Sequence, residues 1–354
     1  MRTIYARNVN EAYTIGLNAL NTEGHLEESR VGPVKVFPTP IGTTYERPWE
    51  RVLFNEKRNA NPFFHLMESL WMLAGRDDVK WIGHYNQSFH KFSDNGKTFH
   101  GAYGYRWRKH FNQDQLVGLV NLLNKDPNTR RAVITMWDPY SDFAIDGRDF
   151  PCNLSIAFRV RNNKLTMSVF NRSNDLIWGA YGANAVHMSI LQEFVASALN
   201  LEMGPYTQMS NDLHAYTDVL AEVGIPDPHP MDPYDMGQVQ TKPLIQDFKT
   251  WHDTLFYFIA DVEIFNERDY QPYKFDTKRF SKEPVFLEIA MPMARAWGYH
   301  KLKNHKAALS VIDDIMPECD WKLACRKWIM RRIESNATSN AEKRRLRKAV
   351  AHDI

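Results

Sequence analysis

The chain has 354 residues, of which 44% are hydrophobic and 24% are charged, a balance typical of a globular protein that buries a large core. Its formal net charge of +2 argues against a nucleic acid or a membrane surface as partner, so any basic site must be local. Three scattered cysteines and a start without an apolar leader exclude a disulfide framework and predict a reducing, cytoplasmic location. The most apolar run, 255–260, is too short to span a membrane.

The first part of the chain predicts two helices with a short strand between them. Residues 9–22 carry apolar side chains at helical spacing, and Gly24 ends this helix. A loop that contains Arg30 then precedes a strand-like segment at 34–37, and a lone loop arginine is usually a solvated charge. Residues 62–75 begin with proline, end with glycine and are apolar nearly all round, so this second helix should be buried.

Glu68 is the polar exception in the second helix. Its neighbours one helical turn away are Phe64, Trp71 and Met72. A carboxylate in such surroundings costs free energy unless it is paired. Two interpretations stay open: a structural ion pair with an arginine, or a pKa raised far enough for Glu68 to move protons near neutrality.

A helix and a strand come next. Residues 116–123 have an apolar stripe at helical spacing, and residues 132–137 are rich in Val, Ile and Thr, as half-buried strands are. Arg130 and Arg131 open this strand. Because adjacent residues of a strand point to opposite faces, at least one of the two arginines must meet an anion or solvent.

A cysteine at the mouth of a predicted β-hairpin is the candidate nucleophile. Residues 154–160 and 165–169 alternate apolar and polar side chains on either side of a turn at 161–163, and Cys152 lies just before the first strand. A nucleophilic cysteine must be partly thiolate, and a cation such as Arg172 can lower its pKa while also binding a phosphate. By itself, a cysteine before a strand is more often structural.

Polar residues follow the hairpin and flank a long predicted helix. Residues 171–175 read Asn-Arg-Ser-Asn-Asp, and residues 184–199 predict a helix for which Asn184 would be the N-cap. His214 and Tyr216 form a His-x-Tyr pair just before a further predicted helix.

The last third of the chain predicts a connector and a helical extension. Prolines crowd 225–233, where neither a helix nor a central strand can form. Residues 245–266 and 302–334 predict helices, and the polar, basic end is typical of a solvated segment. The predicted divisions are a core at 1–225, a connector with helices that pack on the core at 226–334, and a basic tail at 335–354.

Together these motifs resemble the thymidylate synthase superfamily, which includes the deoxypyrimidylate hydroxymethylases. The resemblance covers about residues 8–220, and so many motifs in the family's order are specific although each alone would be weak. The motifs are 65–71, 103–108, 126–131, Pro151-Cys152, 172–175, Gly179, Asn184 and 212–216. The resemblance implies an α+β fold in which a mixed β-sheet, flanked by helices, forms the interface of a homodimer, with the C-terminal helices as an extension.

The resemblance also implies a reaction, the folate-dependent transfer of one carbon to C5 of a deoxypyrimidine monophosphate. Cys152 would add to C6 of the ring, and C5 would then attack the methylene group of 5,10-methylenetetrahydrofolate. Glu68 would organise water and move protons at the base. Tyr103 and Asp175 complete the implied catalytic set.

Binding roles follow from the same resemblance. The implied phosphate ligands are Arg172, Ser173, the mobile-loop Arg30 and, from the second subunit, Arg130 and Arg131. The implied deoxyribose ligands are His214 and Tyr216, and the base would be read by Asn184. The implied folate contacts are Asp175, Trp71 and Phe89. The sequence carries no metal-binding signature.

After the shared methylene adduct, synthases of this family reduce the exocyclic methylene by hydride transfer from folate, whereas hydroxymethylases let water capture it. Departures from the synthase pattern favour capture by water. Phe89 and Phe92 stand where synthases carry a tryptophan pair that shields the intermediate, and Asn153 stands where they place histidine. The end of the chain, 351–354, lacks the closing tail of the synthases. We therefore expect a hydroxymethylase, with thymidylate synthesis as the alternative.

The identity of the base is less firmly predicted. Asn184 favours dUMP, because its amide offers both a donor and an acceptor to uracil, whereas relatives that read cytosine tend to place aspartate there. The loop before it is one residue longer than the family pattern, which would leave Ala183 at the reading position, so dCMP stays open.

Two other classes of function stay open. One is a non-catalytic relative that only binds nucleotides. The other is a nucleic-acid-binding protein that uses the basic segment 343–348, whose affinity should fall steeply with salt. The near-neutral total charge argues against the second class.

Overall fold

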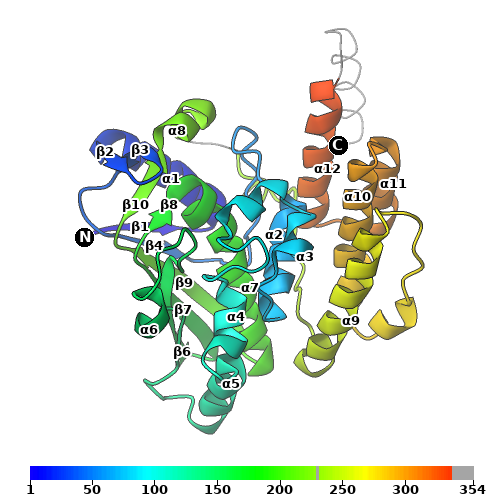
Figure 1. Cartoon of the computed structure of the whole chain (residues 1–354), viewed down its shortest axis with the longest axis horizontal. Helices are drawn as coiled ribbons and strands as arrows, with labels where there is room; N and C mark the ends of the chain where they lie inside the picture. Colours follow the sequence, from blue (N-terminus) through cyan, green and yellow to red (C-terminus); the bar gives the residue numbers. More distant parts are fainter. Residues whose placement is uncertain (229–230, 337–354) are drawn as a thin grey trace.

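The computed structural model describes residues 1–228 and 231–336 (Figure 1). Most of the predicted basic tail, with the segment 343–348, lies outside the described residues. None of the helices in the described ranges is both long and apolar enough to cross a membrane. The cytoplasmic location stays a prediction.

A six-stranded mixed sheet forms the centre of the fold, and its strands lie in the order β1-β4-β9-β7-β6-β5. Their bounds are Arg2–Ala6 for β1, Ile41–Tyr45 for β4, Glu202–Ser210 for β9, Lys164–Asn171 for β7, Asn153–Arg161 for β6 and Val133–Thr135 for β5. The pairs β1-β4 and β7-β9 are parallel, and the other neighbours are antiparallel. This mixed sheet, combined with many helices, confirms the predicted α+β class.

The hairpin of β6 and β7 confirms the predicted alternation. Asn162 and Asn163 form its turn with φ of 49° and 58°, the left-handed values that match the twist of paired antiparallel strands. Cys152 lies directly before β6, as predicted. The strand predicted at 132–137 is shorter than expected, because only Val133–Thr135 pair with β6.

Side chains on the two faces of the sheet meet different surroundings. Along β7, Leu165, Met167 and Val169 are buried, while the alternate residues 166, 168 and 170 keep part of their surface exposed. Helices α1 (Val9–Glu23) and α7 (Asn184–Ala198) contact the sheet. The hydrophobic core therefore lies between the sheet and these helices, and the face with residues 166, 168 and 170 is more open.

A second sheet of four short strands lies in the order β2-β3-β10-β8. Their bounds are His25–Ser29 for β2, Gly32–Val36 for β3, Leu213–Tyr216 for β10 and Asn174–Asp175 for β8. This sheet brings together Arg30, Asp175, His214 and Tyr216, which are far apart in the sequence.

The buried helix predicted at 62–75 is α2, Pro62–Leu73. Asn61 caps it by accepting from the backbone N–H of Phe64, and Gly75 follows its end with a φ of 66°. Every residue of α2 is buried. It contacts α7 as well as α9, α10 and α12, and Figure 1 shows it between the sheet and the C-terminal helices.

The remaining helices are mostly short. Their bounds are Val79–Gly83 for α3, Gln87–Phe92 for η1, Tyr103–Tyr105 for α4, Arg106–His110 for η2, Gln115–Lys125 for α5, Pro139–Asp142 for α6, Leu176–Ala183 for η3 and Thr217–Val223 for α8. In the C-terminal part they are Phe248–Glu267 for α9, Thr277–Phe280 for η4, Phe286–Ala290 for η5, Met291–Lys301 for α10, His305–Ile315 for α11 and Asp320–Asn336 for α12.

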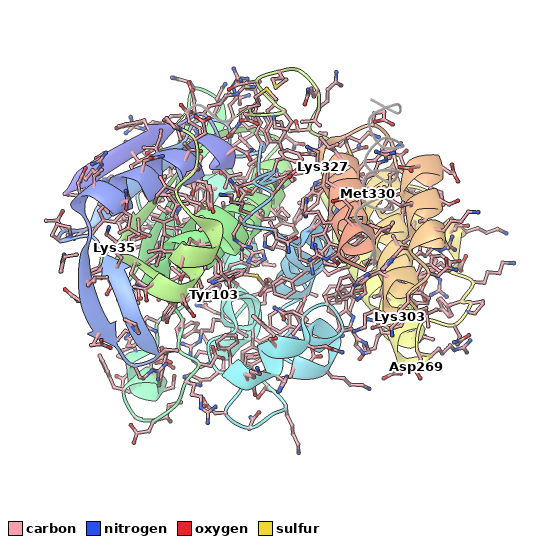
Figure 2. The ribbon with its side chains drawn as sticks, turned by 90° about the horizontal axis from the view of Figure 1, so that it is seen from above. Lys35, Tyr103, Asp269, Lys303, Lys327 and Met330 are labelled. Atoms are coloured by element: carbon pink, nitrogen blue, oxygen red, sulfur yellow. The ribbon has the colours of Figure 1, made fainter. Side chains whose placement is uncertain are left out.

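The C-terminal part differs in detail from the prediction. The single helical stretch predicted at 302–334 is two helices, α11 and α12. Helix α10 was missed because most of its residues are buried, which leaves only a narrow polar face with Arg295 and Tyr299. Figure 2 shows α12, with Lys327 and Met330, beside the other C-terminal helices and well away from Tyr103.

Buried polar contacts connect the core to the C-terminal part. Arg51 pairs with Glu193 on α7 at 2.6 Å, and the same carboxylate accepts from the backbone N–H groups of Leu244 and Ile245. A carboxylate with several donors can remain charged in the interior. Glu193 therefore holds the segment before α9 against α7. The division of the chain at residue 225 stays a prediction.

Candidate active site

Cys152 and Arg172 are brought together by the hairpin, because one precedes β6 and the other follows β7. The backbone N–H of Arg172 donates to the carbonyl of Cys152 at 2.9 Å. Its Nη2 lies 3.9 Å from the Cys152 sulfur, and its guanidinium also donates to the carbonyls of Phe150 and Pro151. The predicted neighbourhood of a thiol and a guanidinium group is therefore present.

The thiol itself does not follow the prediction. Burial raises the pKa of Cys152 above its ordinary value, and this outweighs the Arg172 guanidinium, which acts in the opposite direction. The nearby Asp149 carboxylate also raises the pKa. The expectation that adjacent arginines give a thiol with a lowered pKa is thus wrong for the protein without ligands, where the neutral thiol is favoured.

Alkylation of Cys152 by iodoacetamide is expected to accelerate with pH and to be still rising above about pH 8.5, the ordinary thiol pKa. The sign follows from the raised pKa, because the reactive thiolate forms only as the pH approaches that value. Arg172→Gln should slow alkylation at each pH, since a cation that favours the thiolate is lost. Peptide mass spectrometry measures the rate at this cysteine alone.

Lys164→Gln is the matched control for this experiment, because it removes a positive charge at the opposite end of β7. Its alkylation profile should equal that of the unmodified protein. A plateau already reached near neutral pH would contradict the raised pKa.

Tyr103 completes the immediate surroundings of the sulfur. Burial and the nearby Cys152 raise the pKa of Tyr103 well above its ordinary value, so the phenol stays protonated. Its hydroxyl forms a side-chain hydrogen bond to Cys152 that favours the thiolate. Tyr103 is therefore a neutral hydrogen-bond donor beside the candidate nucleophile Cys152.

Arg30 reaches the same region from the turn between β2 and β3. Its Nη1 donates to the carbonyl of Gly147 at 2.9 Å and its Nη2 to the carbonyl of Arg148 at 3.2 Å. Both carbonyls belong to the loop that leads to Cys152. Ser173 follows Arg172 and is half-buried. Two guanidinium groups thus approach one loop, and each keeps donors that can bind an oxyanion.

The second sheet places His214 opposite Asp175 in the register of β10 and β8. His214 Nδ1 lies 2.6 Å from the Asp212 carboxylate, and its ring packs edge-on against Tyr216. Burial alone would lower the pKa of His214, but the hydrogen bond to Asp212 outweighs burial and raises it. For Tyr216, in contrast, burial raises the pKa of the phenol, so this side chain stays neutral.

Asp175 has one satisfied and one free carboxylate oxygen. Its Oδ1 accepts from the backbone N–H groups of Ile177 and Trp178, whereas Oδ2 is buried without a hydrogen-bond partner. Burial raises the pKa of this carboxyl group. A buried acceptor without a donor fits a ligand that carries N–H groups, as a pterin ring does.

Aromatic side chains lie near this carboxylate and around the end of η1. Phe89 is half-buried and packs against Phe64, Phe92 and Phe99. Trp178 follows Asp175, is 48% exposed and lies beneath the guanidinium of Arg58 at 4.1 Å. Sequence reasoning missed Trp178, although an aromatic residue three positions after a candidate ligand was a usable signal.

Trp71 has a different environment from Phe89. It is 2% exposed, and its indole N–H donates to Asp78 at 3.3 Å. Such a buried tryptophan packs the interior of α2 and offers little surface to a ligand. The folate contacts predicted for Trp71 and Phe89 stay predictions.

Glu68 lies against a histidine and not against an arginine, so the predicted ion pair is corrected. Its Oε2 is 3.1 Å from Nε2 of His187 on α7, and both side chains are buried. The two atoms are close but not aligned for a hydrogen bond. His65 packs edge-on against His187, and burial lowers the pKa of His65 well below its ordinary value, so His65 is neutral.

Asn184 is the first residue of α7 and does not act as its N-cap. Its Nδ2 donates instead to Oδ1 of Asn174 at 3.0 Å, next to Asp175. The helical path before it is broken at Tyr181 and Gly182, which have non-helical backbone angles. This break lies in the loop that is one residue longer than the family pattern, and the Asn184 side chain lies beside the strand that carries Asp175.

Comparison with known families identifies the chain. The family model of thymidylate synthase matches residues 54–274, which is more than half of the chain. The chain belongs to the thymidylate synthase family. The match reaches beyond the predicted core and ends within the C-terminal part, after α9.

Several members of the thymidylate synthase family are similar in sequence. A deoxyuridylate hydroxymethyltransferase of Pseudomonas phage M6 is 43% identical over 347 residues, 94% of this chain and 95% of the relative. A deoxyuridylate hydroxymethyltransferase of Bacillus phage SP01 is 41% identical over 190 residues, 51% of this chain and 50% of the relative. A putative thymidylate synthase of Methanothermobacter marburgensis is 34% identical over 167 residues, 46% of this chain and 73% of the relative.

The arginine pair of this thymidylate synthase family member stands apart from the other predicted ligands. Arg130 and Arg131 are exposed, and Ala132 separates them from β5, the edge strand of the larger sheet. Among the described residues, no carboxylate forms an ion pair with either guanidinium group. The same described residues contain no cluster of His, Cys, Asp and Glu that could hold a metal ion.

Proposed function

We propose that this chain is a deoxyuridylate hydroxymethylase, a C1-transferase that uses 5,10-methylenetetrahydrofolate to convert dUMP into 5-hydroxymethyl-dUMP. The observation that supports the proposal is the distance of 3.9 Å between the Arg172 guanidinium and the Cys152 sulfur, which suits a nucleophile that acts beside a bound phosphate. The phage M6 relative, similar along 94% of this chain, is named a deoxyuridylate hydroxymethyltransferase.

Cys152 begins the proposed reaction by adding its sulfur to C6 of the uracil ring. Binding of the dianionic phosphate by Arg172 and Arg30 fixes the nucleotide above the thiol, and Tyr103 donates to the sulfur. Since burial disfavours the thiolate before substrate binds, the covalent step requires deprotonation within the complex. The addition places electron density on C5, which then acts as a nucleophile.

The folate supplies the one-carbon unit that C5 accepts. Asp175, with its buried free Oδ2, would hold the N–H groups of the pterin, and the exposed face of Trp178 lies beside it. Glu68, with His187 at 3.1 Å, would accept the proton that leaves C5. Loss of this proton would be accompanied by cleavage of the C–N bond to the folate, which would leave as tetrahydrofolate. A water would then add to the exocyclic carbon of the nucleotide and give up a proton, and release of the sulfur from C6 would restore the ring double bond.

Addition of water, and not of hydride, to the exocyclic carbon is supported by the openness of the segment around η1. Phe92 is 56% exposed, where synthases have a tryptophan that shields the intermediate. Asn153 is fully buried behind Cys152, and both of its side-chain polar atoms lack partners. Unpaired buried polar atoms of this kind can hold an ordered water, here one residue away from Cys152.

A homodimer with shared sites is part of the proposal. The exposed Arg130 and Arg131 at the edge of the sheet are available to the phosphate site of a second copy. The more open face with residues 166, 168 and 170 is the surface on which that copy would pack. The dimer would then complete each site with arginines from the other chain.

The mass of the product tests the proposed reaction. Incubation with 5,10-methylenetetrahydrofolate should convert dUMP into a product that has gained CH2O, which is the hydroxymethyl group. A gain of CH2 would mean thymidylate synthesis, and modification of dCMP in preference to dUMP would mean a cytosine substrate. Transfer to neither nucleotide would indicate a relative that binds without turnover, and all three results would contradict the proposal.

A further inference from the structure

Three amide side chains from separate elements, two of them buried, form a continuous chain of hydrogen bonds that ends at Asn184, the predicted base-reading residue. Gln208 on β9 accepts at Oε1 from Nδ2 of Asn174 on β8, at 3.1 Å. Asn174 in turn accepts at Oδ1 from Nδ2 of Asn184 on α7, at 3.0 Å. Gln208 is 1% exposed and Asn174 is 2% exposed, so water cannot replace these partners.

The direction of every hydrogen bond in this series of amides is fixed at its buried end, which is Gln208. Gln208 Nε2 donates to the backbone carbonyl of Ala180 at 3.0 Å, and a carbonyl can only accept. Its second N–H donates to the Tyr45 hydroxyl at 2.6 Å, which itself donates to the same carbonyl at 2.8 Å. Both hydrogens of the amide are therefore used, and Oε1 must face Asn174.

This direction is passed along the chain to Asn184. Asn174 must present its NH2 group to Gln208, so its Oδ1 faces Asn184 and requires a donor there. Asn184 therefore turns Nδ2 towards Asn174, which leaves its Oδ1 and its second N–H for the base. The Ser210 hydroxyl also accepts from Asn174 at 3.1 Å, but a hydroxyl can donate or accept and so does not fix the direction.

The space around the amide pair is closed as well. A Cβ atom on Gly179 would lie 2.5 Å from Oδ1 of Asn174 and 3.3 Å from Nδ2 of Asn184. Real contacts of this kind are longer, so a side chain here would push the pair apart. An inverted Asn184 would instead set two N–H groups or two oxygens against each other in the interior, which costs the desolvation of both.

We propose that Gln208 and Asn174 are positioning residues that determine base specificity by holding the Asn184 amide in one orientation. This inference rests on the proposed function, in which Asn184 faces the pyrimidine. In that orientation Oδ1 accepts from an N3–H group and the free N–H donates to O4, which is the pattern of uracil. Cytosine has an acceptor at N3 and a donor at C4, so it needs the inverted amide.

Gln208→Met tests the inference, because it keeps the length of the side chain and removes the group that fixes Asn174. Asn174 can then invert with Ser210 as its partner, and Asn184 can invert with it. The preference for dUMP over dCMP, taken as the ratio of dissociation constants by calorimetry without folate, should fall by about tenfold, as expected for one misdirected hydrogen bond. Thermal unfolding checks that the variant is folded.

Two further variants make the test independent of the stability of Gln208→Met. Gly179→Ala should also lower the dUMP preference, since it separates Asn174 from Asn184. Ser210→Ala removes the other partner of Asn174 but keeps Gln208, so its ratio should equal that of the unmodified protein.

Each outcome separates the inference from the proposed function. An unmodified protein that prefers dUMP, with Gln208→Met and Gly179→Ala keeping that preference, would overturn the role of the amide chain and leave the proposed function standing. A loss of preference in Ser210→Ala equal to that in Gln208→Met would also overturn it. An unmodified protein that binds neither nucleotide would overturn the proposed function and the inference together.

Discussion

Replacement of Cys152 with alanine is expected to lower product formation by at least about a thousandfold, because C5 of the pyrimidine stays unreactive until a thiolate has added to C6. Binding of dUMP should change little, since Arg172 and Arg30 hold their positions through backbone carbonyls of Gly147, Arg148, Phe150 and Pro151 and not through the sulfur alone. Product is measured by mass spectrometry and dUMP affinity by calorimetry.

Cys319→Ala is the matched control for this replacement. Cys319 is 3% exposed and directly precedes α12 in the C-terminal part, so the same loss of a thiol there should leave turnover in place. Turnover by Cys152→Ala at the rate of the unmodified protein would remove this cysteine from the reaction. Loss of dUMP binding together with activity would instead mean that Cys152 only supports the shape of the site.

Features that depend on neighbouring residues could be predicted from the sequence. The helix α2 has proline at its start, glycine after its end and an apolar surface all round, and these local signals gave nearly its observed bounds. The hairpin around Asn162 and Asn163 follows from alternation on both sides of a turn. Because strand pairing sets residue 153 opposite residue 171, the neighbourhood of Cys152 and Arg172 could also be predicted.

Features that depend on packing between distant segments could not be predicted. His187 comes to Glu68 only because α7 packs on α2, and no sequence spacing between the two indicates this. The pKa of Cys152 depends on how much protein surrounds the sulfur, which a list of nearby arginines does not reveal. In the proposed network, the side-chain orientation of Asn184 on α7 depends on Gln208, which lies two hydrogen bonds away on β9.

The N-cap role predicted for Asn184 was wrong for the same reason, because the position of its side chain depends on packing between distant segments. Asparagine is a common N-cap residue, but the Asn184 side chain donates to the buried Asn174 instead. The helix α7 therefore begins without a side-chain cap. A local preference yields when a buried partner would otherwise be unsatisfied, because an unpaired interior group costs more than a missing cap at a helix end.

Mixing two inactive variants is expected to restore activity if each site takes arginines from the other chain. The Cys152→Ala chain lacks the nucleophile but supplies Arg131 to the site of the other chain. The Arg131→Ala chain keeps the nucleophile but supplies no Arg131 to the other chain. Random exchange of equal amounts gives mixed dimers in half of the population, and each contains one intact site, so about one quarter of the sites should be active. The measurement is product formation after the two variants have been allowed to exchange subunits.

Exchange of subunits must be demonstrated in the same sample, for example by native mass spectrometry of two variants that carry different isotope labels. Lys306→Ala mixed with Cys152→Ala is the matched control: Lys306 is an exposed cation on α11 in the C-terminal part, so its own homodimers should be active and mixing should add nothing beyond dilution. Mixed dimers that form but stay inactive would mean that Arg131 acts within its own chain. The exposed position of Arg131 before the edge strand makes that outcome the less favourable one, since an arginine bound to the phosphate of its own chain would have to lie with Arg30 and Arg172.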